Sequence, residues 1–384
     1  MQRMVLLDGV RGALAFYVLL SHTLPFAPLP AWLHWLFQHG GAAVDVFFIL
    51  SGLVIVRSLT SFEYRSLPFL IARVTRIYPV FLVVFAMAVA VQPLATGFGN
   101  MAWIGTESQA RSIWSSGWPS DWQVLIATHL TMTHGLFPNG LLPDVWVSFL
   151  GAAWSLSTEW QFYLLALLVG ARLGLSRMAW LFVALSAASV AWHATVPEAW
   201  QFSRAFLPNK AQYFALGVIS ALVVRERRAG LAGYCAVLAA TLALSAAQGG
   251  IDKLLPPIMW TLCLAAQMVP ASYRTWSSHS MFPRSGTAVV RLPLAALAGL
   301  LQSRALVWLG AVSYCLYLVN EPVQKVLGVG LAALVQGNAT LFTALWIPGA
   351  IALPLLAAWW LHYQVELPAQ RYGRGVALAA VNAG

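Results

Sequence analysis

Charged residues are scarce in this sequence. They make up 9% of the 384 residues, whereas a soluble domain carries about a quarter. Hydrophobic residues reach 60%. This composition indicates an integral membrane protein and leaves no stretch that requires a separate soluble domain. The net charge of +10 is not gathered on a water-soluble face, so we expect no nucleic-acid partner.

Cysteine is nearly absent, and several soluble active-site motifs are missing. Cys235, Cys263 and Cys315 all lie in apolar runs, where they predict small core residues and neither disulfides nor ligands. The histidines do not show metal-ligand spacing, so we expect no metal. The sequence has no phosphate-binding glycine loop, no His-Glu-x-x-His and no nucleophile elbow.

Long apolar runs dominate what remains. About twenty residues cross a bilayer as a helix, and the runs predict an all-α, polytopic membrane protein with about ten spans in one domain, 1–384. An early Asp8 and Arg11 interrupt the first run, so we expect it to be a span and not a cleaved signal peptide. The expected spans are 5–24, 42–59, 69–92, 150–170, 178–195, 207–224, 231–247, 254–272, 304–330 and 339–363.

The arginine distribution predicts the topology. With the N-terminus in the cytoplasm, most of the 22 basic residues fall in inner connections or at inner helix ends, as the positive-inside rule requires. Both termini are then cytoplasmic. The basic residues that fall outside are Arg111, Arg204, Lys210 and Lys253, and Lys325 lies within the ninth span.

Two connections are long. The outer one, about 93–149, holds five tryptophans, and its segment 122–135 predicts a short surface helix. The cytoplasmic one, about 273–303, is polar and basic, with Ser277, Ser278, His279 and Arg284. We detect no internal repeat of the kind typical of many transporters. The tryptophans of the outer connection are Trp103, Trp114, Trp118, Trp122 and Trp146.

The first span carries Arg11 and His22. Eleven residues bring a helix back within about 20° of its start and about 16 Å along its axis, so the two side chains share a face. Ionisable groups at membrane depth are costly and usually functional. The pair therefore indicates a functional site inside the bundle.

Asp45 enters the second span near the expected depth of His22. A carboxylate beside a histidine fixes its tautomer and raises its basicity, which suits a general base. Capping of its own helix by Asp45 explains the same position. The two interpretations are equally compatible with the spacing.

Arginine and glutamate also occur in the third and fourth spans. Arg73 and Arg76 share a helix face and could clamp phosphates, although taken alone the positive-inside rule is the favoured explanation. Glu159 lies well inside the fourth span and needs a partner such as Arg11 or His22. A structural ion pair and a functional carboxylate are equally compatible with that position.

The ninth span contributes a third polar patch. Tyr314 and Tyr317 fall on one helix face, and Tyr317 and Glu321 are four residues apart, a spacing at which side chains meet. Glu366 closes the tenth span on the inner side, where basic groups or solvent would be its partners.

Five of these stretches, in this order, resemble the membrane acyltransferase-3 family, which includes O-antigen and nodulation-factor acetyltransferases. The resemblance covers nearly the whole chain. Its first two motifs are Asp-Gly-x-Arg-Gly from Asp8, with His22 eleven residues after Arg11, and Gly-x-x-x-Asp-x-Phe-Phe-x-Leu-Ser-Gly at 41–52, which includes Asp45 and Ser51. The third is Arg-x-x-Arg-Ile-x-Pro from Arg73 to Pro79. The others are Trp154, Ser155 and Ser157 with Glu159 and Tyr163, and Ser313-Tyr314 with Tyr317.

The resemblance implies acyl transfer from cytoplasmic acyl-CoA to a hydroxyl, usually of a sugar, on the far side of the membrane. It implies that His22 is catalytic with Arg11 beside it, and that Arg73 and Arg76 help to hold the donor. Relatives often carry a histidine after the late Tyr-Leu, where this chain has Asn320-Glu321. A second catalytic imidazole is therefore not expected at that place.

We accordingly predict an O-acyltransferase of the bacterial inner membrane, in contact with membrane lipid. It uses acyl-CoA, most often acetyl-CoA in this family, as co-substrate and no permanently bound cofactor, and its acceptor is a glycan or glycolipid. The predicted catalytic residues are His22, Asp45, Arg11 and Glu159, and the predicted donor-binding residues are Arg73, Arg76, Tyr78 and Ser51. Supporting roles are expected for Trp154, Ser155, Ser157, Tyr163, Ser313, Tyr314, Tyr317 and Glu321.

Two alternatives remain open from the sequence. His22 either acts as a general base or forms a transient acyl-His22 intermediate. A transporter that uses Arg11, His22 and Glu159 as a substrate or proton site is the rival function from another class.

Overall fold

A computed structural model describes residues 4–94, 101, 103, 117–268 and 288–382. Within these residues the chain is helical, with one isolated antiparallel bridge between Pro138 and Phe202. The helices are α1 Val5–Thr23, α2 Ala31–Phe37, α3 Gly40–Ser61, α4 Ser66–Val91, α6 Trp122–Leu130, α7 Trp154–Thr195, α8 Ala211–Glu226, α9 Leu231–Ala247, α10 Leu255–Met268, α11 Ala288–Leu301, α12 Arg304–Val335, α13 Ala339–Leu361 and α14 Leu367–Asn382.

Six helical stretches in the described residues are long and apolar enough to cross a membrane. This confirms a multi-pass, all-α membrane protein, while the count of ten spans and the side of the termini stay predictions. Two predicted spans, 150–170 and 178–195, lie in α7, which is interrupted at Gly174 by backbone angles outside the helical region. Helices α8, α9 and α10 have 16, 17 and 14 residues, fewer than the usual span.

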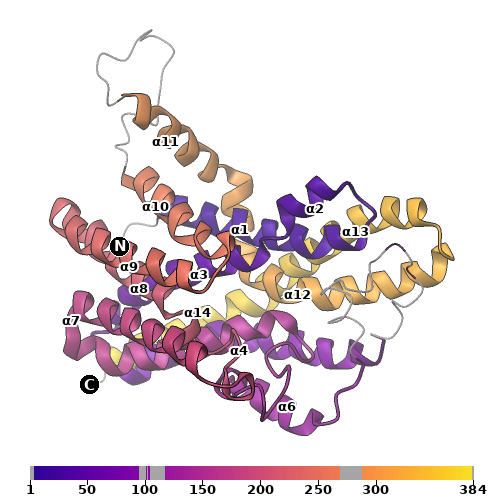
Figure 1. The fold of residues 1–384 in the computed structure, drawn as a ribbon, viewed down its shortest axis with the longest axis horizontal. Coiled ribbons are helices and arrows are strands. Elements are labelled where there is room, and N and C mark those ends of the chain that lie inside the picture. The colour runs from indigo at the N-terminus through magenta and orange to yellow at the C-terminus, as the bar shows by residue number, and fades with distance from the viewer. Residues whose placement is uncertain (1–3, 95–100, 102, 104–116, 269–287, 383–384) are drawn as a thin grey trace.

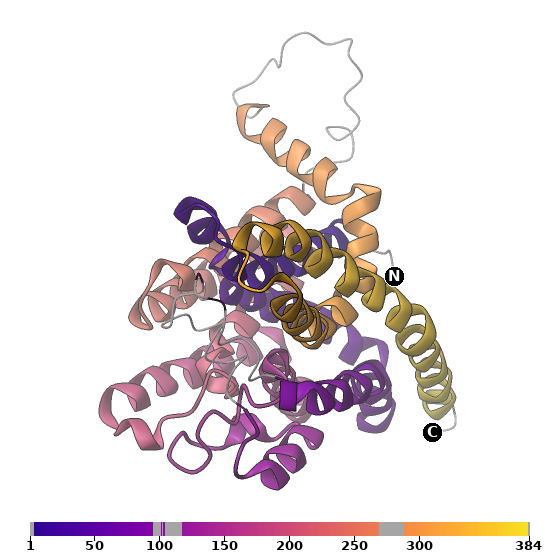
Figure 2. The same cartoon turned by 90° about the vertical axis from the view of Figure 1, so that its right-hand side faces the viewer.

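Helix α1 lies inside the bundle and packs against α3, α11, α12 and α13. Figure 1 shows α1, α3 and α12 crossing the middle of the molecule, with both chain ends at the left. Helices α4 and α7 lie below them in that view, and Figure 2 shows α11 projecting away from the bundle. Five of these helices, α1, α3, α4, α7 and α12, contribute to the cavity described below.

The predicted cytoplasmic loop 273–303 is wrong in its second half. Residues 288–301 form α11, which packs on α10 and α1. One face of the apolar run from Leu292 to Leu301, with Ala295, Ala298 and Leu301, is buried against those neighbours. Ser277, Ser278, His279 and Arg284 lie outside the described residues. The C-terminal helix α14, which packs on α4, was not predicted either.

The outer connection holds the predicted short helix as α6, followed by a turn at His134–Leu136. It does not simply lie on the surface, because His129 and His134 are fully buried and their rings stack 4.2 Å apart. Burial lowers the pKa of His129 to about 4 and that of His134 well below its usual value. Both imidazoles are therefore neutral near pH 7. Trp114 of this connection lies outside the described residues.

Glycines bring the central helices into close contact. A Cβ atom on Gly12 of α1 would collide with the Leu306 carbonyl oxygen of α12, and one on Gly310 with the Asp8 carbonyl oxygen. Gly217 of α8 meets the Ile49 carbonyl oxygen of α3 in the same way. Small residues at helix crossings let backbones approach closely, which is a main source of packing energy in membranes.

We expect Gly217→Ala to lower the free energy of unfolding by about 1–3 kcal/mol, because the added methyl group forces α3 and α8 apart. Gly330→Ala is the matched control, since Gly330 lies in α12 with no atom within 4 Å of an added Cβ. Thermal unfolding in detergent, followed by tryptophan fluorescence, gives the comparison. Equal midpoints for the two variants would contradict the close crossing.

Candidate functional site

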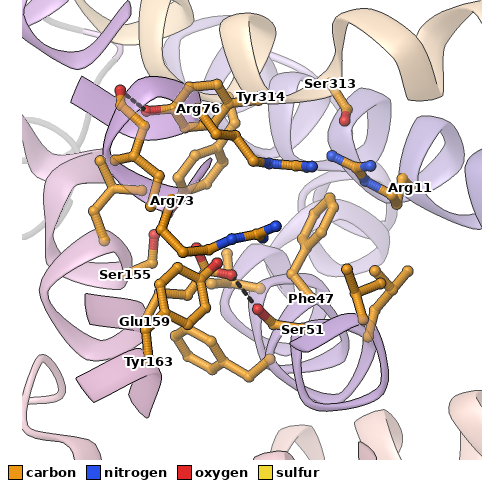
Figure 3. A pocket seen from close by; sticks show the side chains of 17 residues that line it. Arg11, Phe47, Ser51, Arg73, Arg76, Ser155, Glu159, Tyr163, Ser313 and Tyr314 are labelled. Atoms are coloured by element: carbon orange, nitrogen blue, oxygen red, sulfur yellow. Dashed lines mark hydrogen bonds between the residues drawn. The ribbon is translucent and has the colours of Figure 1, made fainter. Parts of the chain in front are cut away.

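A cavity of about 790 Å³, including its open mouth, lies between α1, α3, α4, α7 and α12. Figure 3 shows the guanidinium groups of Arg11 from α1 and of Arg73 and Arg76 from α4 pointing into it. The lining side chains are Arg11, Val44, Phe47, Phe48, Leu50, Ser51, Val54, Arg73, Arg76, Ile77, Ser155, Leu156, Glu159, Tyr163, Ser313, Tyr314 and Tyr317. Sequence motifs hundreds of residues apart thus meet at one place.

Most of the predicted site residues line this cavity. They include three of the four sequence-predicted donor-binding residues, Arg73, Arg76 and Ser51, and two of the four predicted catalytic ones, Arg11 and Glu159. Tyr78 is the exception in the donor set, because its ring packs edge-on against Trp160 at 5.8 Å. The supporting residues on the lining are Ser155, Tyr163, Ser313, Tyr314 and Tyr317.

Arg73 is held in place from two sides. Its Nη2 donates to the Ser58 hydroxyl at 3.0 Å, and its guanidinium lies 5.7 Å from the Phe69 ring centre and 5.8 Å from that of Tyr163. Its buried Nε has no hydrogen-bond acceptor. A cation held by hydroxyl and aromatic groups keeps its charge available for an anionic ligand.

Glu159 is the single carboxylate on the cavity lining. It accepts a 2.6 Å hydrogen bond from the Ser51 hydroxyl, and no salt bridge joins it to an arginine in the described residues. Three arginines and one carboxylate give the cavity an excess of positive charge. Such an excess inside an apolar bundle favours an anionic ligand, because an unpaired buried cation is costly.

Hydroxyl groups of α12 support the arginine-bearing helix. The Tyr314 hydroxyl donates to the Ile77 carbonyl oxygen at 2.7 Å, directly after Arg76 on α4 and two residues before Pro79. Pro79 has no backbone N–H, so the Thr75 carbonyl oxygen one turn earlier loses its helix hydrogen bond. Tyr314 therefore holds the arginine face of α4 against α12.

His22 does not line the cavity. Its Nδ1 lies 2.7 Å from Oδ1 of Asn320, on α12 one turn beyond the lining residue Tyr317. His22 is half-buried and Asn320 is buried. Arg11 and His22 thus occupy different parts of the same helix face, as their spacing predicts.

The predicted pairing of Asp45 with His22 is wrong. Both Asp45 carboxylate oxygens accept hydrogen bonds from Nζ of Lys210, at 2.6 and 2.9 Å, and both side chains are buried. The Lys210 ammonium group forms an ion pair with the Asp45 carboxylate, because a buried cation needs a counter-charge. Helix capping does not explain Asp45 either, since it lies one turn beyond the start of α3.

Three other supporting residues have structural contacts. The Ser157 hydroxyl donates to the Met132 carbonyl oxygen at 2.8 Å and accepts from the Gly135 amide at 3.1 Å, which ties the outer connection to α7. Trp154 packs edge-on against Phe48 at 5.5 Å. Glu321 forms a buried ion pair with Lys325, one turn later on α12, at 3.2 Å; the predicted i,i+4 neighbour Tyr317 lies one turn before Glu321.

Lys210, Asn320 and Lys325 were not predicted as site residues. A signal for Lys325 was present, because it lies four residues after Glu321 on the same helix, a spacing at which side chains meet. Sequence alone does not pair Lys210 with Asp45, since the two are 165 residues apart. The sequence signal for Asn320 was that relatives often carry a histidine near this position.

Cys315, His362 and Glu366 form a group whose donor atoms lie within 4.8 Å of one another, close enough to hold a metal ion. The sequence spacing did not suggest it. Hydrogen bonds already join these groups, because His362 Nδ1 lies 2.7 Å and Cys315 Sγ 3.2 Å from one Glu366 oxygen, while Gln370 donates to the other at 2.8 Å. Cys235, in contrast, is exposed and not a core residue.

We expect Asp45→Asn to lower the free energy of unfolding by about 3–5 kcal/mol, because it leaves the Lys210 ammonium buried without a counter-charge. The double variant Asp45→Asn/Lys210→Met should regain most of that loss. Asp252→Asn is the control, since Asp252 pairs with His39 at a half-exposed position and such pairs contribute about 1 kcal/mol or less. Stability of Asp45→Asn equal to wild type in detergent unfolding would refute a structural ion pair.

Comparison with known proteins adds independent information. The family model described as "Acyltransferase domain" matches residues 5–363. The chain is 28% identical to "Acyltransferase MdmB" of Streptomyces mycarofaciens, over 86% of this chain and 81% of that protein. The comparison with solved structures found no match.

Proposed function

The chain belongs to the acyltransferase family whose model it matches, and from that premise we propose that it moves an acyl group from cytoplasmic acyl-CoA to a hydroxyl on the far side of the membrane. The enzyme is a multi-pass membrane O-acyltransferase. Acetyl is the proposed acyl group, a glycan or glycolipid the proposed acceptor, and the bacterial inner membrane the proposed location. The transporter alternative loses its basis, because the family match covers nearly the whole chain.

The arginine cavity is the observation that carries the donor assignment. Arg11, Arg73 and Arg76 converge on a space that holds one carboxylate, and arginine recognises phosphate through paired, charge-assisted hydrogen bonds. Coenzyme A carries its negative charge on phosphates and its thioester on an extended arm. The phosphates would occupy the arginine end, and the arm would continue along α1 and α12.

His22 is the proposed general base. The acceptor oxygen attacks the thioester carbonyl carbon while His22 accepts the hydroxyl proton, the carbon–sulfur bond breaks, and the proton passes to the departing thiolate. Arg11 lies about 16 Å from His22 along α1, so it would grip the phosphate end of the donor together with Arg73 and Arg76. An acyl-His22 intermediate is the alternative route, in which the imidazole itself attacks the carbonyl carbon.

On the outer side, aromatic groups offer a surface for an acceptor. The Arg204 guanidinium lies 4.6 Å from the Trp146 ring centre and 5.7 Å from that of Trp154. Trp154 is buried, so the half-buried Trp146 is the indole that would stack on a sugar ring. Lys210 lies 5.7 Å from the same Trp154 ring, which joins this surface to the Asp45–Lys210 pair.

His22→Ala tests the catalytic step. We expect acyl transfer from labelled acetyl-CoA to a panel of glycan acceptors, measured in detergent, to fall by about 10²–10⁴-fold, since general-base catalysis contributes that much. Binding of acetyl-CoA, measured by thermal shift, should persist. His34→Ala is the control, because His34 of α2 bonds only the Ala27 carbonyl oxygen. Wild-type turnover by His22→Ala would reject His22 as the catalytic base.

Arg76→Ala tests the donor site. We expect KM for acetyl-CoA to rise at least tenfold, because a hydrogen bond to a charged group contributes about 1.5–3 kcal/mol and each 1.4 kcal/mol is a factor of ten. KM for acetyl-pantetheine, which lacks the nucleotide phosphates, should not change. The control is Arg371→Ala on the exposed face of α14. An equal rise for both donors would contradict phosphate binding at Arg76.

A further inference from the structure

Asn320 is the hydrogen-bond partner of His22. Its Oδ1 lies 2.7 Å from His22 Nδ1, and it is 1% exposed. The position follows the late tyrosine motif of α12, one turn beyond Tyr317 at the edge of the cavity. Nothing in the proposed mechanism has so far used this contact.

The orientation of the Asn320 amide is determined by its own helix. Its Nδ2 donates to the Leu316 carbonyl oxygen at 3.0 Å and to the Tyr317 carbonyl oxygen at 2.7 Å. Both amide hydrogens are therefore used. A flipped amide would set its oxygen against two carbonyl oxygens, so the group that faces His22 is the acceptor Oδ1.

An acceptor at this position determines the protonation of the imidazole. His22 Nδ1 must carry a hydrogen to donate to Oδ1, and a neutral imidazole has only one N–H. Nε2 of neutral His22 is then the unprotonated nitrogen with a free lone pair. The partner of one ring nitrogen thus sets the function of the other, as in catalytic and metal-binding histidines generally.

Carboxylates on the helices around α1 do not fill this role. Helices α2, α3, α11, α12 and α13 pack against α1. Their described carboxylates are Asp45, bound by Lys210, and Glu321, bound by Lys325. The other ionisable side chains on these helices are His34, Arg57, Arg304, Tyr314, Cys315 and Tyr317, and the side chain of Arg291 lies outside the described residues.

We propose that Asn320 is the positioning residue of the acyl-transfer site: its amide holds His22 as the Nδ1–H tautomer and so directs Nε2 toward the acceptor hydroxyl. This inference rests on the proposed role of His22 as base. A neutral amide orients the ring without forming an ion pair with the imidazolium. The proton taken from the acceptor leaves again with the thiolate, and in between the amide stabilises the imidazolium less than a carboxylate would.

The wild-type protein gives the first test. Nitrogen-15 NMR of the histidine-labelled, detergent-solubilised protein, with His22→Gln to assign the signals, reports which ring nitrogen carries the hydrogen. We expect a protonated Nδ1 and an unprotonated Nε2 at a pH where the ring is neutral. The Nε2–H tautomer, or a mixture of both, would overturn the proposal without recourse to any activity assay.

Variants of Asn320 give the second test. Asn320→Leu should lower kcat at least tenfold and leave KM for acetyl-CoA within twofold, while its His22 signals shift to a tautomer mixture. Asn320→Asp retains an acceptor oxygen, so it should retain the Nδ1–H tautomer. It should also move the acid limb of the pH–kcat profile, where protonation of the base lowers kcat, to higher pH, because a carboxylate stabilises the imidazolium.

Gln324→Leu is the matched control. Gln324 is a buried amide on the same face of α12 and donates to the Thr23 hydroxyl of α1 at 2.9 Å, next to His22 in sequence. We expect its removal to leave the His22 tautomer unchanged and to cost less than twofold in kcat. An equal kcat loss in Gln324→Leu and Asn320→Leu would reduce Asn320 to a helix-packing residue and overturn the proposal.

The two proposals fail in different ways. Wild-type turnover by His22→Ala would reject His22 as the base, whatever the tautomer. Loss of activity in His22→Ala together with wild-type kcat and unchanged His22 signals in Asn320→Leu would reject only the role of Asn320.

Discussion

Cations inside an apolar bundle are the constraint on which this structure depends. Arg11, Arg73 and Arg76 converge on one cavity, where isolated charges are costly. The protein lowers that cost with the Ser58 hydroxyl and the aromatic rings around Arg73, and with the single carboxylate of Glu159. It does not neutralise all three charges. A phosphate-bearing donor would supply the missing negative charge, so the same arginines that lower the stability of the folded protein favour its ligand.

The other buried charges are paired away from this cavity. Asp45 with Lys210 and Glu321 with Lys325 form closed ion pairs, and Glu366 is saturated by His362, Gln370 and Cys315. Breaking such a pair is costly, while the pair itself adds little stability. These groups therefore specify the arrangement of helices, whereas the incompletely paired arginines specify a ligand. Pairing therefore distinguishes structural charges from ligand-binding charges in a membrane interior. Amino-acid composition alone does not distinguish them.

Much of the fold and of the cavity was predictable from sequence because the signals are local. Apolar runs gave α1, α3, α4 and α12 with ends within five residues of those observed, and helical spacing placed Arg73 and Arg76 on one face of their helix. Partner choice was not predictable, since it depends on distances between segments far apart in the chain. Asp45 was expected beside His22 at a similar depth, but Lys210, placed by the turn before α8, lies closer and carries the charge that Asp45 requires. Helix α11 was missed because the polar stretch that precedes it concealed its apolar run.

Helix α1 carries both Arg11 and His22 and therefore sets the distance between the arginine cavity and the proposed base. Arg11 and His22 lie on one face about 16 Å apart along the axis, and α12 follows α1 closely because Gly12 and Gly310 allow their backbones to touch. A donor with its phosphates among the arginines can reach His22 only with a thioester on an extended arm, which is the form of acyl-pantetheine. Tyr317 lines the cavity, and its carbonyl oxygen receives the amide of Asn320 at 2.7 Å. The residue proposed to orient His22 is thus anchored to a residue that lines the proposed donor cavity, and any shift of α12 against α1 would disturb donor binding and the base together.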